Sequence, residues 1–183
     1  MSEATGLIVA AIIAGFVAFF SLIISKEQTV SDFRQQWIDE LRKDIATVSS
    51  CVFSIHGTSI ARNKNEQELW DRVKTDFIHF KEVIARIRLR LNPNETRKVE
   101  GPATSAVLGS LTELESIFGS ATPQFHKLES LVATLVSNAN VILKENWHRV
   151  RSGEPIYQIT KWLTLGITVA VAIGSLLHIF KVF

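Results

Sequence analysis

Arg72 and His79 are the residues whose types and spacing come nearest to a catalytic pattern. An imidazole can take up and return a proton near neutral pH, and a guanidinium can hold a phosphate through two hydrogen bonds. The simpler interpretation is a solvated helix face, on which Arg72 and Asp76 form an ion pair at a spacing of four residues. We favour the solvated face and expect no enzyme activity, with Arg72 and His79 as the only catalytic candidates.

The remaining polar residues predict neither a metal site nor a cofactor site. Glutamate and histidine stand three residues apart at His79–Glu82 and Glu145–His148. A di-metal site would need a matching helix with further carboxylates. Cys51 is the only cysteine, which excludes an internal disulfide and a multi-cysteine zinc site, so a buried inert thiol is expected. The sequence also lacks a glycine-rich phosphate loop. We therefore expect no metal ion and no cofactor.

Three arginines, Arg86, Arg88 and Arg90, stand at alternate positions near the end of a helical pattern. The helix dipole and the anionic headgroups of a lipid surface both favour cations there. RNA binding is the alternative, but no aromatic residues that could stack on bases interleave with these arginines. The formal net charge of +2 on 183 residues also argues against a dedicated nucleic-acid protein. We expect contact with membrane lipids at these arginines and no nucleic-acid partner.

Four segments repeat apolar residues every three or four positions, which predicts amphipathic helices. They run over about 29–56, 65–91, 103–118 and 122–151. Their apolar stripes are Trp37, Leu41, Ile45, Val48, Val52 and Ile55; Leu69, Val73, Phe77, Phe80, Ile84, Ile87 and Leu91; Val107, Leu111, Leu114 and Phe118; and Phe125, Leu128, Val132, Leu135, Ala139 and Ile142. An even number of helices returns the chain to its starting end, so we predict an antiparallel four-helix bundle.

Residues typical of helix ends stand near the boundaries of these segments. Thr29 and Asp32 have the spacing of a capping box at the start of the first helix. Gly119 is a C-terminal cap for the third helix, and Thr122–Pro123 are the cap and first turn of the fourth. These signals predict four separate helices.

Two apolar runs without Asp, Glu, Lys or Arg flank the bundle, at residues 6–24 and 162–180. Each run is about 28 Å long as a helix, which matches the roughly 30 Å hydrocarbon core of a bilayer. The runs also account for a hydrophobic fraction of 46% and a mean hydropathy of +0.19. We therefore predict an all-α membrane protein, with transmembrane helices at 4–25 and 159–181 on either side of a bundle at 26–158.

The basic residues predict the orientation of these spans. Lys181 is the only Lys or Arg outside the region between the two runs, and Lys26 and Lys161 stand at the inner edges of that region. Basic residues favour the cytoplasmic side of a membrane. We predict a bacterial inner-membrane protein with a cytoplasmic bundle and both termini in the periplasm.

Small residues recur every four positions in both apolar runs. They are Ala10, Ala14 and Ala18 in the first run, and Gly166, Ala170 and Gly174 in the second. Such a stripe lets two helix backbones approach closely, and close packing drives helix association in lipid. We expect these faces to pack within a hairpin or between copies in a homo-oligomer.

The sequence carries two resemblances to known families. Residues 31–45, SDFRQQWIDELRKDI, resemble a run that follows the first span in many bacterial membrane proteins. The spacing of Arg72 and His79 is similar to the arginine–histidine pattern of HEPN-type ribonucleases, in which the histidine transfers protons and the arginine holds phosphate. With its two-span layout, the chain resembles membrane accessory proteins of RNA-targeting CRISPR systems that carry a degenerate HEPN-like domain. That resemblance implies a membrane pore that depolarises the infected cell.

These patterns lead to one leading hypothesis and two alternatives. The leading hypothesis is a non-enzymatic, oligomer-forming effector of the inner membrane, a pore or membrane-perturbing protein in antiphage defence or stress. The first alternative is a membrane-tethered adaptor whose bundle binds a protein partner. The second is a degenerate HEPN-like ribonuclease.

Overall fold

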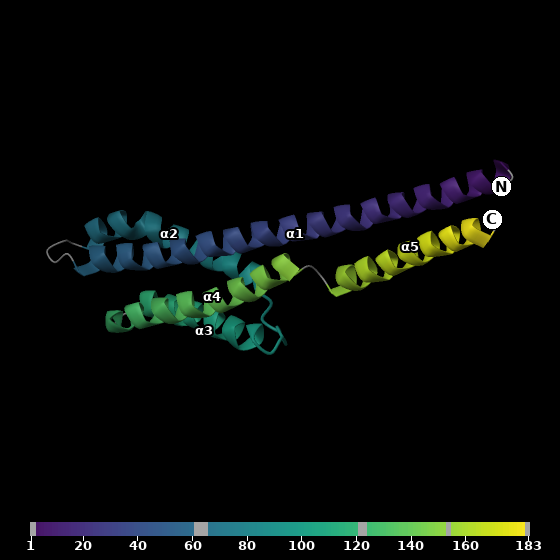
Figure 1. Ribbon diagram of the computed structural model, residues 1–183. Coiled ribbons are helices and arrows are strands. Elements are labelled where there is room, and N and C mark those ends of the chain that lie inside the picture. The colour runs from purple at the N-terminus through teal and green to yellow at the C-terminus, as the bar shows by residue number, and fades with distance from the viewer. Residues whose placement is uncertain (1–2, 61–65, 121–123, 153–154, 182–183) are drawn as a thin grey trace. The chain divides into compact units, whose positions relative to one another are not determined.

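The computed structural model describes residues 3–60, 66–120, 124–152 and 155–181 (Figure 1). Within these residues the chain is helical and contains no strand. The elements are α1 (Glu3–Ile60), α2 (Glu66–Arg90), α3 (Glu100–Phe118), the short 3-10 helix η1 (Phe125–Lys127), α4 (Leu128–Ser152) and α5 (Pro155–Lys181). The predicted all-α class is therefore correct for the described part of the chain.

The chain forms two compact units, each of which is described by itself. The first, which we call the bundle, contains Gln35–His148 and therefore the second half of α1, then α2, α3 and most of α4. The second, which we call the helical pair, contains Met1–Arg34 and Arg149–Phe183. The bundle thus begins nine residues later and ends ten residues earlier than the predicted limits of 26 and 158.

The core of the bundle is formed by the predicted apolar stripes. The buried hydrophobic residues are Ile38, Leu41, Ile45, Val48, Cys51, Val52 and Ile55 from α1; Val73, Phe80, Val83, Ile84, Ile87 and Leu91 from α2 and its end; Ala103, Val107, Leu111, Leu114 and Ile117 from α3; and Leu128, Val132, Leu135, Ala139, Ile142 and Leu143 from α4. A period of 3.6 residues places each set on one side of its helix. The predicted helical bundle and most of its core are therefore confirmed, but helix ends differ: the fourth helix begins at Leu128, after η1, rather than near residue 122.

The predicted and observed cores differ where a bulky ring has an aliphatic neighbour. Trp37 is half-buried while Ile38 beside it is only 2% exposed, and Phe118 is half-buried while Ile117 is buried. Adjacent helical residues point about 100° apart, so the compact aliphatic side chain fills the interior and the ring covers its margin. The ring of Phe118 meets that of Phe80 edge to face, with centroids 5.3 Å apart.

The predicted start of the first helix is wrong, because α1 runs without a break from Glu3 to Ile60. Thr29 is an interior position, and its hydroxyl donates a hydrogen bond to the carbonyl oxygen of Ser25 at 2.9 Å. The predicted capping signals at Thr122 and Pro123 lie outside the described residues.

The third helix starts three residues earlier than predicted, at Glu100. Pro102 therefore lies in its first turn, where a residue without a backbone N–H costs no helical hydrogen bond. At the other end of the helix, the N–H of Gly119 donates to the carbonyl oxygen of Glu115 at 3.0 Å, so the predicted C-terminal cap is confirmed.

The predicted membrane architecture is contradicted. Among the described residues, no helix joins sufficient length to a sufficiently apolar sequence to cross a bilayer. The two transmembrane helices at 4–25 and 159–181 are therefore corrected, and so are the inner-membrane location and the membrane pore that depended on them.

Candidate protein-docking site on the bundle

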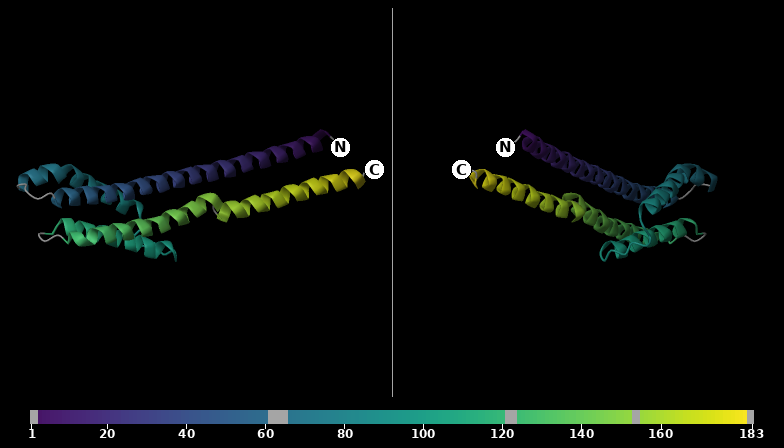
Figure 2. Two further views of the ribbon diagram at one scale, coloured as in Figure 1. Left: turned by 60° about the vertical axis from the view of Figure 1, so that its left-hand side comes forward. Right: turned by 90° about the vertical axis from the view of Figure 1, so that its right-hand side faces the viewer.

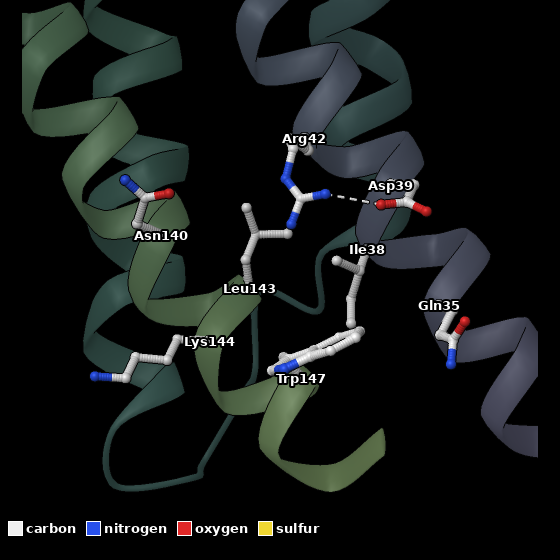
Figure 3. A pocket seen from close by; sticks show the side chains of 8 residues that line it. All are labelled: Gln35, Ile38, Asp39, Arg42, Asn140, Leu143, Lys144 and Trp147. Carbon is white, nitrogen blue, oxygen red and sulfur yellow. Dashed lines mark hydrogen bonds and ion pairs between the residues drawn. The ribbon is translucent and has the colours of Figure 1, made fainter. Parts of the chain in front are cut away.

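An open groove of about 640 Å³ lies between α1 and α4 on the surface of the bundle (Figure 3). It is lined by Gln35, Ile38, Asp39 and Arg42 from α1 and by Asn140, Leu143, Lys144 and Trp147 from α4. The two helices run antiparallel in the bundle (Figures 1 and 2). Each contributes residues spaced three or four apart, so the groove follows one face of each helix.

The floor of this groove is apolar and its rim is polar. Ile38 and Leu143 are buried between the two helices, whereas Trp147 is 51% exposed. Figure 3 shows the Trp147 ring lying below Ile38, with the Arg42 guanidinium above Leu143. An indole in this position offers a large apolar surface and one N–H donor to an occupant.

Two cations and one carboxylate set the charge of the groove. Arg42 Nη1 lies 2.8 Å from Asp39 Oδ1, and both side chains are well exposed. An exposed ion pair of this kind contributes little to stability and exchanges partners at low cost. Lys144 is exposed on the opposite wall. The groove can therefore present an apolar surface together with positive charge.

The arginines predicted to contact lipid lie elsewhere and form ion pairs within the bundle. Arg86 Nη2 lies 3.1 Å from Asp44 Oδ1, and Arg90 pairs with both Asp44 and Glu40. The Asp44 side chain is only 5% exposed. Because a buried carboxylate requires charged or hydrogen-bonding partners, the two arginines join α2 to α1 at this point.

Arg88, the third predicted lipid contact, joins α2 to α3. Its Nη2 atom lies 2.6 Å from Glu115 Oε2, and Lys81 Nζ lies 2.9 Å from Glu115 Oε1. Burial alone raises the pKa of Glu115, but the hydrogen bonds and charges of Lys81 and Arg88 outweigh burial and leave that pKa below its ordinary value. The carboxylate is thus held in its ionised form.

A second buried carboxylate joins α3 to α4. Glu100 accepts a hydrogen bond from Asn146 Nδ2 at 2.9 Å, and Arg97 Nη1 lies 2.8 Å from its other oxygen. Its side chain is almost completely buried. Each of these buried charges is paired with side chains of the bundle itself, so the contacts are structural.

The catalytic candidates Arg72 and His79 are both exposed on α2. His79 Nδ1 lies 3.5 Å from Glu82 Oε2. Asp76 does not pair with Arg72 as expected from its spacing; instead its carboxylate accepts a short hydrogen bond from the Ser54 hydroxyl of α1. The structure therefore uses Asp76 to join two helices.

Cys51 is buried beside this link. Burial raises the pKa of the Cys51 thiol, and the negative charge of Asp76 raises it further, so the thiol stays protonated and unreactive at neutral pH. In the described residues, no group of three or more His, Cys, Asp and Glu is arranged to hold a metal ion.

The small-residue faces in the helical pair are exposed wherever their side chains are described. Ala14, Ala18, Gly166, Ala170 and Gly174 are all exposed, and Ala10 lies outside the residues whose side chains are described. A methyl group added at Gly166 or Gly174 would meet nothing within 4 Å. Whether these faces pack between copies of the chain stays a prediction.

Sequence reasoning missed the groove and the buried carboxylates. Trp147 falls on the polar side of the α4 pattern and is exposed. An exposed indole outside the core stripe can mark a binding surface, so this position was the one signal in the sequence for the groove. A comparison of the chain with family models, curated proteins and solved structures finds no match.

Proposed function

We propose that the chain is an adaptor whose bundle binds a protein partner in the groove between α1 and α4. The observation that carries this proposal is the half-exposed Trp147 over the groove's apolar floor. Tryptophan and arginine dominate the binding energy of protein interfaces when they line a pocket that excludes water. Trp147 and Arg42 stand on opposite walls of this groove.

The groove is better suited to a protein than to catalysis. Its lining contains no histidine and no cysteine, and its one carboxylate, Asp39, is paired with Arg42. Open shape and a flat aromatic surface favour a side chain or a helix of another protein over a small substrate, which usually binds in an enclosed pocket.

The ribonuclease alternative has less support from the contacts on α2. His79 and Arg72 are exposed on a helix surface, and the neighbouring Asp76 is engaged by Ser54. An acid–base histidine requires a substrate site that positions the reacting group, and the described pocket lies on α1 and α4 instead. A role in antiphage defence or stress stays a prediction.

Selection of peptides on the purified full chain tests the proposal. A displayed random peptide library is selected against the wild-type protein, and the dissociation constants of the enriched peptides are measured by fluorescence anisotropy. Trp147→Ala should weaken their binding at least tenfold, because it removes the largest contact surface in the groove. Trp70→Ala is the matched control, since Trp70 is 45% exposed but belongs to α2.

Equal loss of affinity in both variants, or in neither, would refute the proposal. The variants must first be shown by circular dichroism to keep the helical content of the wild-type chain. Binding that survives Trp147→Ala would mean that the peptides use another surface of the protein.

A further inference from the structure

The groove ends at Arg42 and Asn140, but the helix faces that line it continue along α1 and α4, because residues three and four apart share one face. Ala46 follows Arg42 by one turn on α1, and Val136 precedes Asn140 by one turn on the antiparallel α4. Both are exposed, as is Ala133 one further turn along α4. Ala46 and Ala133 are small enough for another backbone to approach closely, and Val136 adds exposed apolar surface.

Larger apolar groups stand near the two ends of this surface. Trp147 marks one end, and Phe53, which is 47% exposed, follows Arg42 by eleven residues, or about three turns, on α1. Glu129 precedes Trp147 by 18 residues on α4, which corresponds to about 27 Å along the helix. An occupant that covers the whole surface is therefore about five helical turns long.

The backbone of the bundle selects the conformation of this occupant. The N–H and C=O groups of α1 and α4 are engaged in their own helices, so neither offers an edge to which an extended peptide could hydrogen-bond. A helical occupant satisfies its own backbone and can place apolar side chains at intervals of three or four residues, which matches the spacing of the lining.

The charges along the surface give this occupant a polarity. At the Trp147 end, Arg42 and Lys144 outnumber the single carboxylate Asp39, which leaves a net positive charge, while the exposed Glu129 lies at the opposite end. A helix with acidic side chains at one end and basic side chains at the other is complementary to this distribution. Charge complementarity of this kind selects partners and sets their orientation.

We propose that the occupant is an amphipathic helix of a partner protein, about 18 residues long, with its acidic end over Lys144 and its basic end over Glu129. This inference rests on the proposed docking function and adds the class and orientation of the ligand. A second copy of the chain is the competing occupant, and the experiment below distinguishes the two.

Three model helical peptides test the proposed polarity. They share one leucine stripe over 18 residues; the first has glutamates at one end and lysines at the other, the second has lysines at both ends, and the third has glutamates at both ends. Their dissociation constants for the full chain are measured at low and high salt. The first peptide should bind the wild-type chain about tenfold more tightly than the other two, and less so in high salt.

Reversal of one charge on the protein gives the matched control. Lys144→Glu leaves one cation, Arg42, against two carboxylates at the Trp147 end, so both ends of the surface carry a net negative charge and the peptide with two lysine ends should become the tightest ligand. Lys98→Glu makes the same change of charge at an exposed site outside the groove and should keep the wild-type order. Far-ultraviolet circular dichroism should show that the bound peptide gains helix.

Each outcome separates the inference from the proposed function. Equal affinity of the three peptides, or an unchanged order with Lys144→Glu, overturns the amphipathic-helix inference, while library peptides that depend on Trp147 would still support docking. Failure of every library peptide to depend on Trp147 refutes docking itself. If sedimentation shows self-association that Trp147→Ala abolishes, the occupant is a second copy, and the partner-helix inference is wrong.

Discussion

Arg90 on α2 forms an ion pair with Asp44 on α1, across 46 residues of chain, and Asp44 is one of the most buried charged residues of the bundle. Arg86 approaches the same carboxylate with two of its nitrogen atoms, at 3.1 and 3.2 Å. One buried carboxylate thus determines which turns of α1 and α2 face each other.

Arg90→Ala should lower the free energy of unfolding by about 2 kcal/mol, because it leaves the buried Asp44 with one charged partner instead of two. Arg42→Ala removes an arginine from an exposed pair with Asp39 and should cost less than about 1 kcal/mol. Urea unfolding of both variants checks the difference. Similar losses in the two variants would show that burial of Asp44 does not decide the energy of its ion pair.

Gly101→Ala should destabilise the bundle, whereas Gly109→Ala in the same helix should stabilise it. A Cβ atom at Gly101 would lie 2.5 Å from the carbonyl oxygen of Glu95, so the linker before α3 must move. A Cβ atom at Gly109 meets nothing within 4 Å, and alanine gains about 1 kcal/mol over glycine in a helix interior. Thermal unfolding followed by circular dichroism measures both. A gain at Gly101 would contradict the close approach.

Glu115→Gln should reduce stability at neutral pH and have a smaller effect in acid. The pKa of Glu115 is lowered in the folded chain, so its ionised form contributes stability above the ordinary glutamate pKa of 4.5. That contribution is lost as the pH falls from 4.5 through the lowered folded-state pKa. Urea unfolding of the wild-type chain and the variant from pH 7 to pH 3 should show the difference shrinking over this range. A constant difference would assign the effect to packing.

Phe80→Ala should cost about 3–5 kcal/mol, because Phe80 is completely buried and its ring meets that of Phe118. Phe77→Ala should cost less, since Phe77 belongs to the predicted stripe but is only half-buried. Chemical unfolding of the two variants ranks them. The reverse ranking would mean that the inward face of α2 is centred on Phe77.

The sequence by itself determined the bundle helices and most of their core. Leu41, Val48, Val107 and Leu135 follow the 3.6-residue period of the helix, which depends only on neighbours within about one turn of the same segment. Gly119 was a local signal of the same kind. Such patterns predict which side of a helix is buried without knowledge of its neighbour.

The tertiary structure alone decided which side chains pair between helices and which side chains remain exposed on the surface of the bundle. The register between antiparallel helices places Arg86 and Arg90 against Asp44, and i,i+4 spacing within α2 contains no information about α1. The same register leaves Trp147 exposed beside Arg42, which creates the groove. The apolar runs at 6–24 and 162–180 predicted two transmembrane spans, but among the described residues no helix is both long and apolar enough to cross a bilayer. Packing between helices, rather than periodicity within them, therefore produced the candidate site.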